Sequence, residues 1–189
     1  MFEQIMGKVA AGAARLLRAR GVRRLARRED GTAAVEFAIV VAPFLALVFA
    51  IIETGIVFFA GQTLETAVAD ASRLIITGQA QAQGFTQAKF KEAMCARIFG
   101  LFDCANGVSI DVRTSTSFSS TDMSKPVNAQ GQLQTDNFAY TPGGPGQIVV
   151  VRAVYAWPVY VSLLGFNLSD LSGSKRLLMA TAAFRNEPF

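Results

Sequence analysis

Residues 37–59 read FAIVVAPFLALVFAIIETGIVFF, and this apolar run decides the fold of the chain. Glu53 is its only charged residue. A helix of about 23 residues rises about 34 Å, which is enough to cross a hydrocarbon core of about 30 Å. The alternative is a buried helix of a soluble protein, but such helices rarely hold more than about 14 consecutive apolar residues. The run therefore predicts one membrane-spanning helix.

The charges on either side of the run predict its orientation. Eight Lys and Arg residues precede it within residues 1–31, whereas Arg73 is the only one in the about 20 residues that follow. Because cytoplasmic flanks of membrane helices are rich in Lys and Arg, we expect a cytoplasmic N-terminus and an exported body. The leader is longer than that of a cleaved secretory signal, and its polar break at residues 27–31 precedes the apolar run.

The composition excludes several classes of function. The chain contains no histidine and only two cysteines. It therefore lacks the residues for Ser-His-Asp or Cys-His catalysis, for histidine-based metal sites and for a four-cysteine zinc site. The net charge of +4 resides in the leader, and the remainder is close to neutral, which offers no surface for nucleic acid. We expect no enzymatic activity, no metal, no cofactor and no nucleic-acid partner.

Two carboxylates lie in or next to the apolar run. Glu36 stands at its start, and Glu53 follows about 25 Å further along a helix, at an angle of about 100° around it. They are therefore too far apart to form a paired-carboxylate acid/base site. For Glu53 we expect an interfacial side chain that reaches the lipid headgroups.

Residues 31–55, GTAAVEFAIVVAPFLALVFAIIETG, resemble the processing site and spine helix of the TadE-like pseudopilins. These are minor components of the tight-adherence (Tad) pilus, within the type IV pilin superfamily. The resemblance implies that a prepilin peptidase cuts after Gly31, which makes Thr32 the new N-terminus and places Glu36 at position +5. It continues through GQTLETAVADASRLIITGQ after the apolar run and through the C-terminal AAFRNEPF, and Pro43 fits the pilin pattern.

The resemblance also implies a function and a set of partners. We expect a structural minor pseudopilin for biogenesis of a Tad (Flp) pilus that mediates surface adhesion and biofilm formation. Its partners are then the membrane, the prepilin peptidase, other pseudopilins, the major pilin and the assembly platform. The expected location is the bacterial inner membrane, as a single-pass protein with a periplasmic C-terminus, and the extracellular pilus after assembly. Glu36 is then an assembly residue that pairs with the α-amino group of Thr32 on a neighbouring subunit.

The expected domain organisation has three parts: a cytoplasmic leader at 1–31, a transmembrane part of the spine helix at 32–60, and an α+β pseudopilin domain at 61–189. The apolar stripe of Leu64, Val68, Ala71 and Ile75 predicts that the spine helix continues to Thr77. Two helices hinged at Gly61 are the alternative. A linker at 78–84 and a second amphipathic helix over 85–101 follow.

Alternating apolar residues predict three strands, within residues 107–116, 147–157 and 175–186, which form an antiparallel sheet on the long helix. The polar residues 114–146 are expected to form a mobile loop, or else a contact surface. Residues 160–166, YVSLLGF, are expected to lie in the core, with a membrane-skimming loop or a subunit contact as the alternatives. Cys95 and Cys104 are expected to form a disulfide in an oxidising periplasm.

Two other classes of function remain open at this point. A permanently anchored single-pass receptor or binding module would use the helix only as a tether and would need neither Gly31 nor Glu36. An anchored hydrolase would need a nucleophile, a base or a metal cluster, and no readable motif supplies one.

Overall fold

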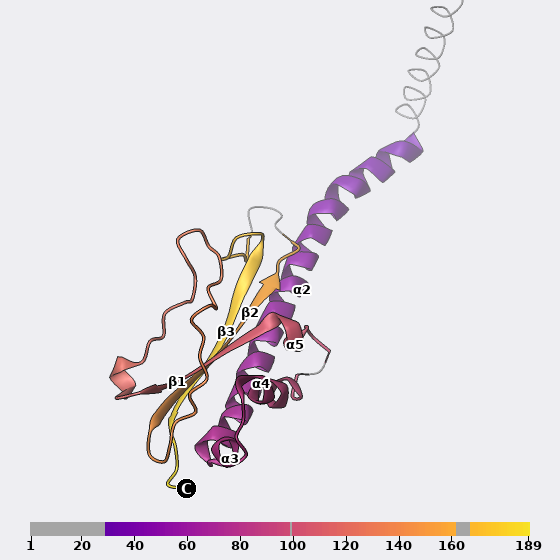
Figure 1. Cartoon of the computed structure of the whole chain (residues 1–189). Coiled ribbons are helices and arrows are strands. Elements are labelled where there is room, and N and C mark those ends of the chain that lie inside the picture. Colours follow the sequence, from indigo (N-terminus) through magenta and orange to yellow (C-terminus); the bar gives the residue numbers. More distant parts are fainter. Residues whose placement is uncertain (1–28, 99, 162–166) are drawn as a thin grey trace, which may run out of the picture. The chain divides into compact units, whose positions relative to one another are not determined.

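The computed structural model describes residues 29–98, 100–161 and 167–189 (Figure 1). Most of the predicted leader, residues 1–28, lies outside the described residues. The chain divides into two compact units, one ending at Val48 and the other comprising Phe49–Phe189, and each is described by itself.

The apolar run forms part of one helix, α2 (Glu29–Ile76), which is long and apolar enough to cross a membrane. It begins at Glu29, three residues before the expected transmembrane part at 32–60, and continues across Pro43. It also continues across Gly61, so the alternative of two helices hinged at that glycine is wrong. The helix ends where expected, because Gly78 adopts a left-handed conformation with φ of 74°.

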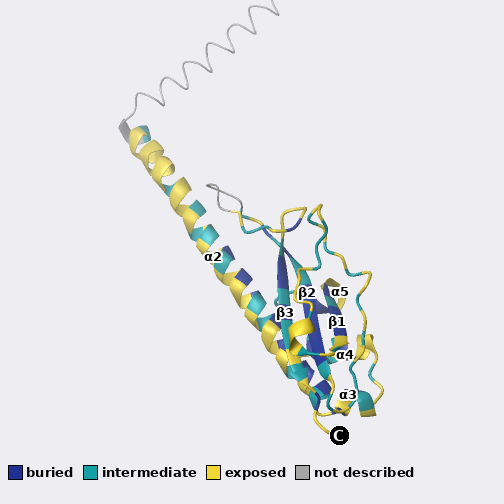
Figure 2. Cartoon of the chain, turned by 90° about the vertical axis from the view of Figure 1, so that its left-hand side faces the viewer, coloured by how far each residue is buried: buried dark blue, intermediate teal, exposed yellow. Residues whose placement is uncertain are grey.

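The surface of α2 changes along its length. From Val35 to Phe59 its large apolar side chains are exposed, apart from a few that are half-buried and Val57, which is buried. Within the second unit, α2 carries a buried stripe on the face that packs against the sheet (Figure 2). This stripe comprises Val57, Ala60, Leu64, Ala67, Val68, Ala71 and Ile75, and it includes all four positions expected from the sequence.

Short helices connect α2 to the sheet. The expected linker contains α3 (Gln79–Ala82), and the expected second helix is only α4 (Gln87–Cys95). Thr86 caps α4 by accepting a hydrogen bond from the Lys89 N–H, while Phe90 and Met94 are buried beneath it. A further turn, α5 (Cys104–Gly107), leads into the first strand.

The three expected strands are present and form one antiparallel sheet in the order β1-β2-β3, which confirms the α+β fold. They are β1 (Val108–Ser115), β2 (Ile148–Pro158) and β3 (Lys175–Arg185). One face packs on α2 and α4, through alternate residues such as Ile110, Val151 and Ala180. This packing forms the main core of the unit, as expected from the alternating pattern.

The opposite face of the sheet is covered by the long β1–β2 loop, residues 116–147, which includes a short 3₁₀ turn, η1 (Phe118–Ser120). Val127, Leu133 and Phe138 of this loop pack on a second cluster that contains Val154 and Leu177. The loop also lies along the outer edge of β1, because Val112 N–H donates to the Ala139 carbonyl and Thr141 N–H donates to the Val112 carbonyl, both at 2.8 Å. The expectation of a merely mobile loop is therefore wrong.

The C-terminal residues close the end of α2. Glu187 N–H donates to the Ile76 carbonyl at 2.9 Å, which satisfies a group that the helix itself leaves free. Asn186 is buried, and its side-chain amide donates to the carbonyls of Pro142 and Gly144, each at 3.0 Å. The terminal segment therefore holds the end of the helix, the long loop and the sheet together.

Candidate functional site

The residues expected to be processed lie in the first turns of α2. Gly31 is half-buried, whereas Thr32 and Glu36 are exposed. Thr32 and Glu36 are four residues apart in a helix, so they lie on the same face about one turn apart. The carboxylate of Glu36 and the position of the amino group expected at Thr32 therefore lie about one turn apart on one face. The other exposed residues of this stretch are apolar.

Glu53, the second carboxylate of the apolar run, is only 7% exposed. Its Oε1 accepts a hydrogen bond from the Tyr160 backbone N–H at 2.6 Å, and its Oε2 accepts one from the Val161 N–H at 3.0 Å. The side chain is therefore turned toward its own chain and not outward, while its expected level at the membrane interface stays a prediction. The carboxylate instead binds the segment that follows β2, and charge-assisted bonds of this kind are stronger than those between neutral groups.

The segment after β2 differs from its expected role in the core. Tyr160 is 82% exposed, which contradicts the core assignment for that residue. Val161 is half-buried, and residues 162–166 of the same segment lie outside the described residues. We name the contact among Glu53, Tyr160 and Val161 the Glu53 clamp.

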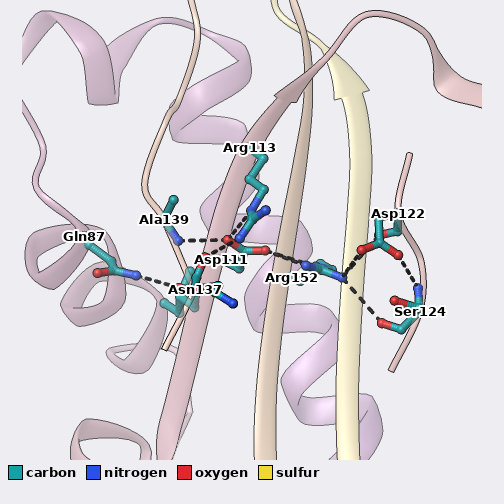
Figure 3. A network of polar contacts seen from close by, with 9 residues as sticks. Gln87, Asp111, Arg113, Asp122, Ser124, Asn137, Ala139 and Arg152 are labelled. Atoms are coloured by element: carbon teal, nitrogen blue, oxygen red, sulfur yellow. Dashed lines mark hydrogen bonds and ion pairs between the residues drawn. The ribbon is translucent and has the colours of Figure 1, made fainter. Parts of the chain in front are cut away.

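A buried ion pair lies on the sheet face that the long loop covers (Figure 3). Asp111 of β1 is 1% exposed and Arg152 of β2 is 7% exposed, and the two residues pair directly in the strand register. Arg152 Nη2 lies 2.6 Å from Asp111 Oδ2. Arg113 Nε donates to Asp111 Oδ1 at 2.8 Å, on the side where Arg113 also donates to the Asn137 carbonyl.

The same ion pair fixes both ends of the long loop. Asp111 Oδ1 accepts a hydrogen bond from the Ala139 N–H at 2.9 Å, and Arg152 Nη1 donates to the carbonyls of Asp122 at 3.2 Å and Ser124 at 3.4 Å. Burial alone would raise the pKa of Asp111. The hydrogen bonds from Ala139, Arg152 and Arg113 together outweigh it and hold the pKa below its usual value. The carboxyl group therefore stays ionised and acts as a structural anchor.

The expected disulfide is present between Cys95, at the end of α4, and Cys104, at the start of α5, with their Cα atoms 5.6 Å apart. It joins the short helices on the α2 side of the sheet. Phe102, within the loop that it closes, packs on Tyr155 with ring centroids 4.6 Å apart. The bridge thus secures a covering segment that has little regular structure of its own.

The described part of the unit has open recesses without a chemical centre. One of about 350 Å³ lies between α4 and β1, next to Gln87 and Thr135, and one of about 240 Å³ lies between α2 and β3, next to Phe58 and Met179. Among the described residues, no group of three His, Cys, Asp or Glu side chains is placed to hold a metal ion.

Sequence reasoning missed both buried carboxylate sites. The partners of Glu53 are more than 100 residues away in the chain, and Arg152 is 41 residues from Asp111. One signal was readable: Asp111 and Arg152 each interrupt a run of apolar strand residues. Two opposite charges in otherwise apolar strands indicate a buried pair when the strands are neighbours.

Comparison with known proteins gives a match over most of α2. Residues 31–73 match the family model described as TadE-like protein. No curated protein and no solved structure matches the chain. The matched residues include Gly31, Thr32 and Glu36 as well as Glu53, so the resemblance to TadE-like proteins is confirmed over this segment. The chain therefore carries a TadE-like segment at residues 31–73, which is less than a quarter of its length.

Proposed function

We propose that this chain is a minor pseudopilin that is needed for assembly of a Tad pilus and, through the pilus, for surface adhesion and biofilm formation. The observation that carries this proposal is the TadE-like match over residues 31–73, because it includes the processing residues and the apolar helix together. A membrane helix that later becomes a packing spine needs apolar side chains around its surface. The exposed apolar residues of α2 meet that requirement.

The proposal divides the chain into a leader at residues 1–31, a transmembrane part of the spine at 32–60 and an exported domain at 61–189. The prepilin peptidase removes the leader by cutting between Gly31 and Thr32. Before assembly, the protein spans the inner membrane once, with its N-terminus in the cytoplasm and its C-terminus in the periplasm. The basic leader supports this orientation, since positively charged flanks remain on the cytoplasmic side.

Glu36 is the proposed assembly residue. It is exposed on α2 and lies among apolar neighbours, so transfer into a fibre of packed helices would bury its charge. The new α-amino group of Thr32 on a neighbouring subunit supplies a cation for that carboxylate. Because an unpaired buried carboxylate is costly, this pairing selects one axial register between neighbouring spines.

The role of Glu36 is tested with Glu36→Ala and a matched control, Glu65→Ala. Glu65 is an exposed carboxylate on the same helix, and it accepts a hydrogen bond from Gln62 only three residues away. Both variants are expected to remain in the membrane fraction after carbonate extraction. Only Glu36→Ala is expected to be absent from pili sheared from the cells.

The outcome separates the two open classes of function. If Glu36→Ala enters sheared pili as efficiently as Glu65→Ala, then the proposed assembly role is wrong. Unchanged amounts of pili and of surface adhesion in a strain that lacks the whole chain would favour the permanently anchored binding module instead.

A further inference from the structure

The exposed surface of α2 in the second unit changes from apolar to polar at one level. Between Phe49 and Phe59 its exposed residues have no polar side chain; they are Phe49, Ile51, Ile52, Gly55, Ile56, Phe58 and Phe59. Gln62 is the first exposed polar residue, and Glu65 and Thr66 follow it. These residues lie within the candidate membrane span, and from the change of their exposed surface we place the water-facing boundary of the helix between Phe59 and Gln62.

The Glu53 clamp lies below that boundary. Nine residues of helix separate Glu53 from Gln62, which corresponds to about 13 Å along the axis. Because the Tyr160 and Val161 N–H groups bond directly to the Glu53 carboxylate, this part of the segment after β2 is at the same depth. The edge of the folded unit therefore extends past the boundary, onto the apolar side.

The depth matches the dimensions of a bilayer. The segment from Thr32 to Phe59 rises about 42 Å as a helix, which is close to the thickness of about 40–45 Å for hydrocarbon core and headgroup layers together. About 20 central residues of that rise fill the hydrocarbon core, which places Glu53 just inside the outer edge of that core, next to the headgroup layer. A carboxylate at this depth is poorly hydrated, and the two backbone N–H groups replace the water that it lacks.

The side chains at this edge fit the same environment. Tyr160 is 82% exposed, and tyrosine is enriched where membrane and water meet because its ring is apolar and its hydroxyl is polar. Lys175 and Arg176 begin β3 opposite Pro158 and Trp157 in the register, next to the same edge. Positive side chains there attract the headgroups of anionic lipids.

We propose that the Glu53 clamp seats the edge of the folded unit, at Tyr160, where the hydrocarbon core meets the outer headgroup layer of a bilayer that contains anionic phospholipid. The proposal rests on membrane insertion of α2, as in the proposed function. The domain is then fixed against the lipid surface before assembly and does not swing freely on a tether. Extraction into a fibre must remove Tyr160 from lipid as well as the helix.

The test uses single-tryptophan reporters in the full chain. The chain has one tryptophan, Trp157, which packs among Phe102 and Tyr155, and Trp157→Phe provides the background. Tyr160→Trp places a reporter at the proposed edge. Phe118→Trp places a control on η1, where Phe118 is 55% exposed. The proteins are reconstituted in vesicles of phosphatidylcholine and phosphatidylglycerol, and insertion is checked by flotation.

Two quenchers measure the surroundings of each reporter. Nitroxide-labelled phosphatidylcholine, with the label near the headgroup, is expected to quench the reporter at 160 several-fold more than the reporter at 118. Aqueous acrylamide is expected to give the opposite order. Adding Glu53→Ala removes both acceptor oxygens and is expected to move the reporter at 160 towards acrylamide quenching, whereas Glu65→Ala leaves it in lipid.

The possible failures are distinguishable. If the chain does not float with the vesicles, then the membrane anchoring is wrong and this inference fails with it. If the chain floats but acrylamide quenches the reporter at 160 as strongly as the reporter at 118, the inference alone is wrong. Protection of the reporter at 160 from both quenchers would indicate that a second copy covers the edge, which also overturns the inference. If Glu53→Ala fails to fold, the comparison of the reporters at 160 and 118 with Glu53 intact still tests whether Tyr160 contacts lipid.

Discussion

Asp111→Asn removes the negative charge from an ion pair that is almost fully enclosed. Asp111 is 1% exposed and Arg152 is 7% exposed, so the variant leaves a buried guanidinium whose remaining carboxylate partner is the more distant Asp122, with Oδ2 3.9 Å from Nη1. Breaking a buried pair by removal of one partner costs about 3–5 kcal/mol of unfolding free energy. The asparagine oxygen can still accept one of the hydrogen bonds that the carboxylate accepts, so we expect the unfolding free energy to fall by about 3 kcal/mol.

Denaturant unfolding of the full chain in detergent micelles measures this cost. Fluorescence of Trp157, which lies on β2 five residues beyond Arg152, reports unfolding of the sheet. The matched control is Asp70→Asn, because Asp70 pairs with Arg97 at 3.0 Å on the surface, with 39% and 45% of their side chains exposed. A surface pair of this kind contributes about 0–1 kcal/mol. Equal destabilisation by the two substitutions would refute the structural role of the buried pair.

The acid dependence of stability provides an independent measure of the same carboxylate. The pKa of Asp111 is lower in the folded chain than its usual value, so its contribution is complete above the unfolded pKa of about 4. That contribution is lost as the pH falls through the lower folded pKa. Since hydrogen bonds also lower the pKa of Asp103 and of Asp122, the difference between the unsubstituted protein and Asp111→Asn isolates Asp111. A constant difference between the two proteins from neutral pH to acid would contradict this assignment.

Two further predictions concern the disulfide and the packing of the chain at Gly78. Reduction of the Cys95–Cys104 bridge removes a covalent constraint on a loop of about ten residues, and we expect it to lower the unfolding free energy by about 2.5–3 kcal/mol. Two thiols that alkylate without reductant in exported protein would contradict the bridge. Gly78→Ala is expected to destabilise by about 1–2 kcal/mol, because φ is 74° and an added Cβ would lie 2.3 Å from the Phe189 ring. Gly61→Ala, inside α2 with nothing within 4 Å, is expected to be neutral or stabilising by about 0.5–1 kcal/mol, and equal effects of the two substitutions would argue against the packing of Phe189 on Gly78.

The regular elements were predictable because each leaves a local pattern. The length of the apolar run predicts α2, and the alternation of Val108, Ile110 and Val112 predicts β1. The stop at Gly78 follows from its freedom to adopt positive φ. Each of these signals lies within a few residues of the feature that it predicts.

The contacts that complete the unit were not predictable in the same way. Glu53 was expected to face headgroups, because nothing near it in sequence indicates the two N–H groups supplied by residues 160 and 161. The polar composition of the long loop predicted mobility, yet its few apolar residues, such as Val127 and Phe138, cover the second face of the sheet. Both outcomes depend on pairs of residues that only the folded chain brings together.

The candidate processing and assembly site stays a prediction, and it rests on a local signal. Gly31, Thr32 and Glu36 form one short motif, and the resemblance of this motif to TadE-like proteins needed no tertiary contact. The structure adds that Thr32 and Glu36 lie on one face of an exposed helix, which is the arrangement that pairing between neighbouring subunits would use.

The central claim is that this chain is a pseudopilin whose leader is removed after Gly31. The most direct test is the N-terminal sequence of the protein isolated from cells with and without the prepilin peptidase. We predict a chain that begins at Thr32 when the peptidase is present and retains residues 1–31 when it is absent. The same N-terminus in both cells, or a cut at any other bond, would contradict the claim.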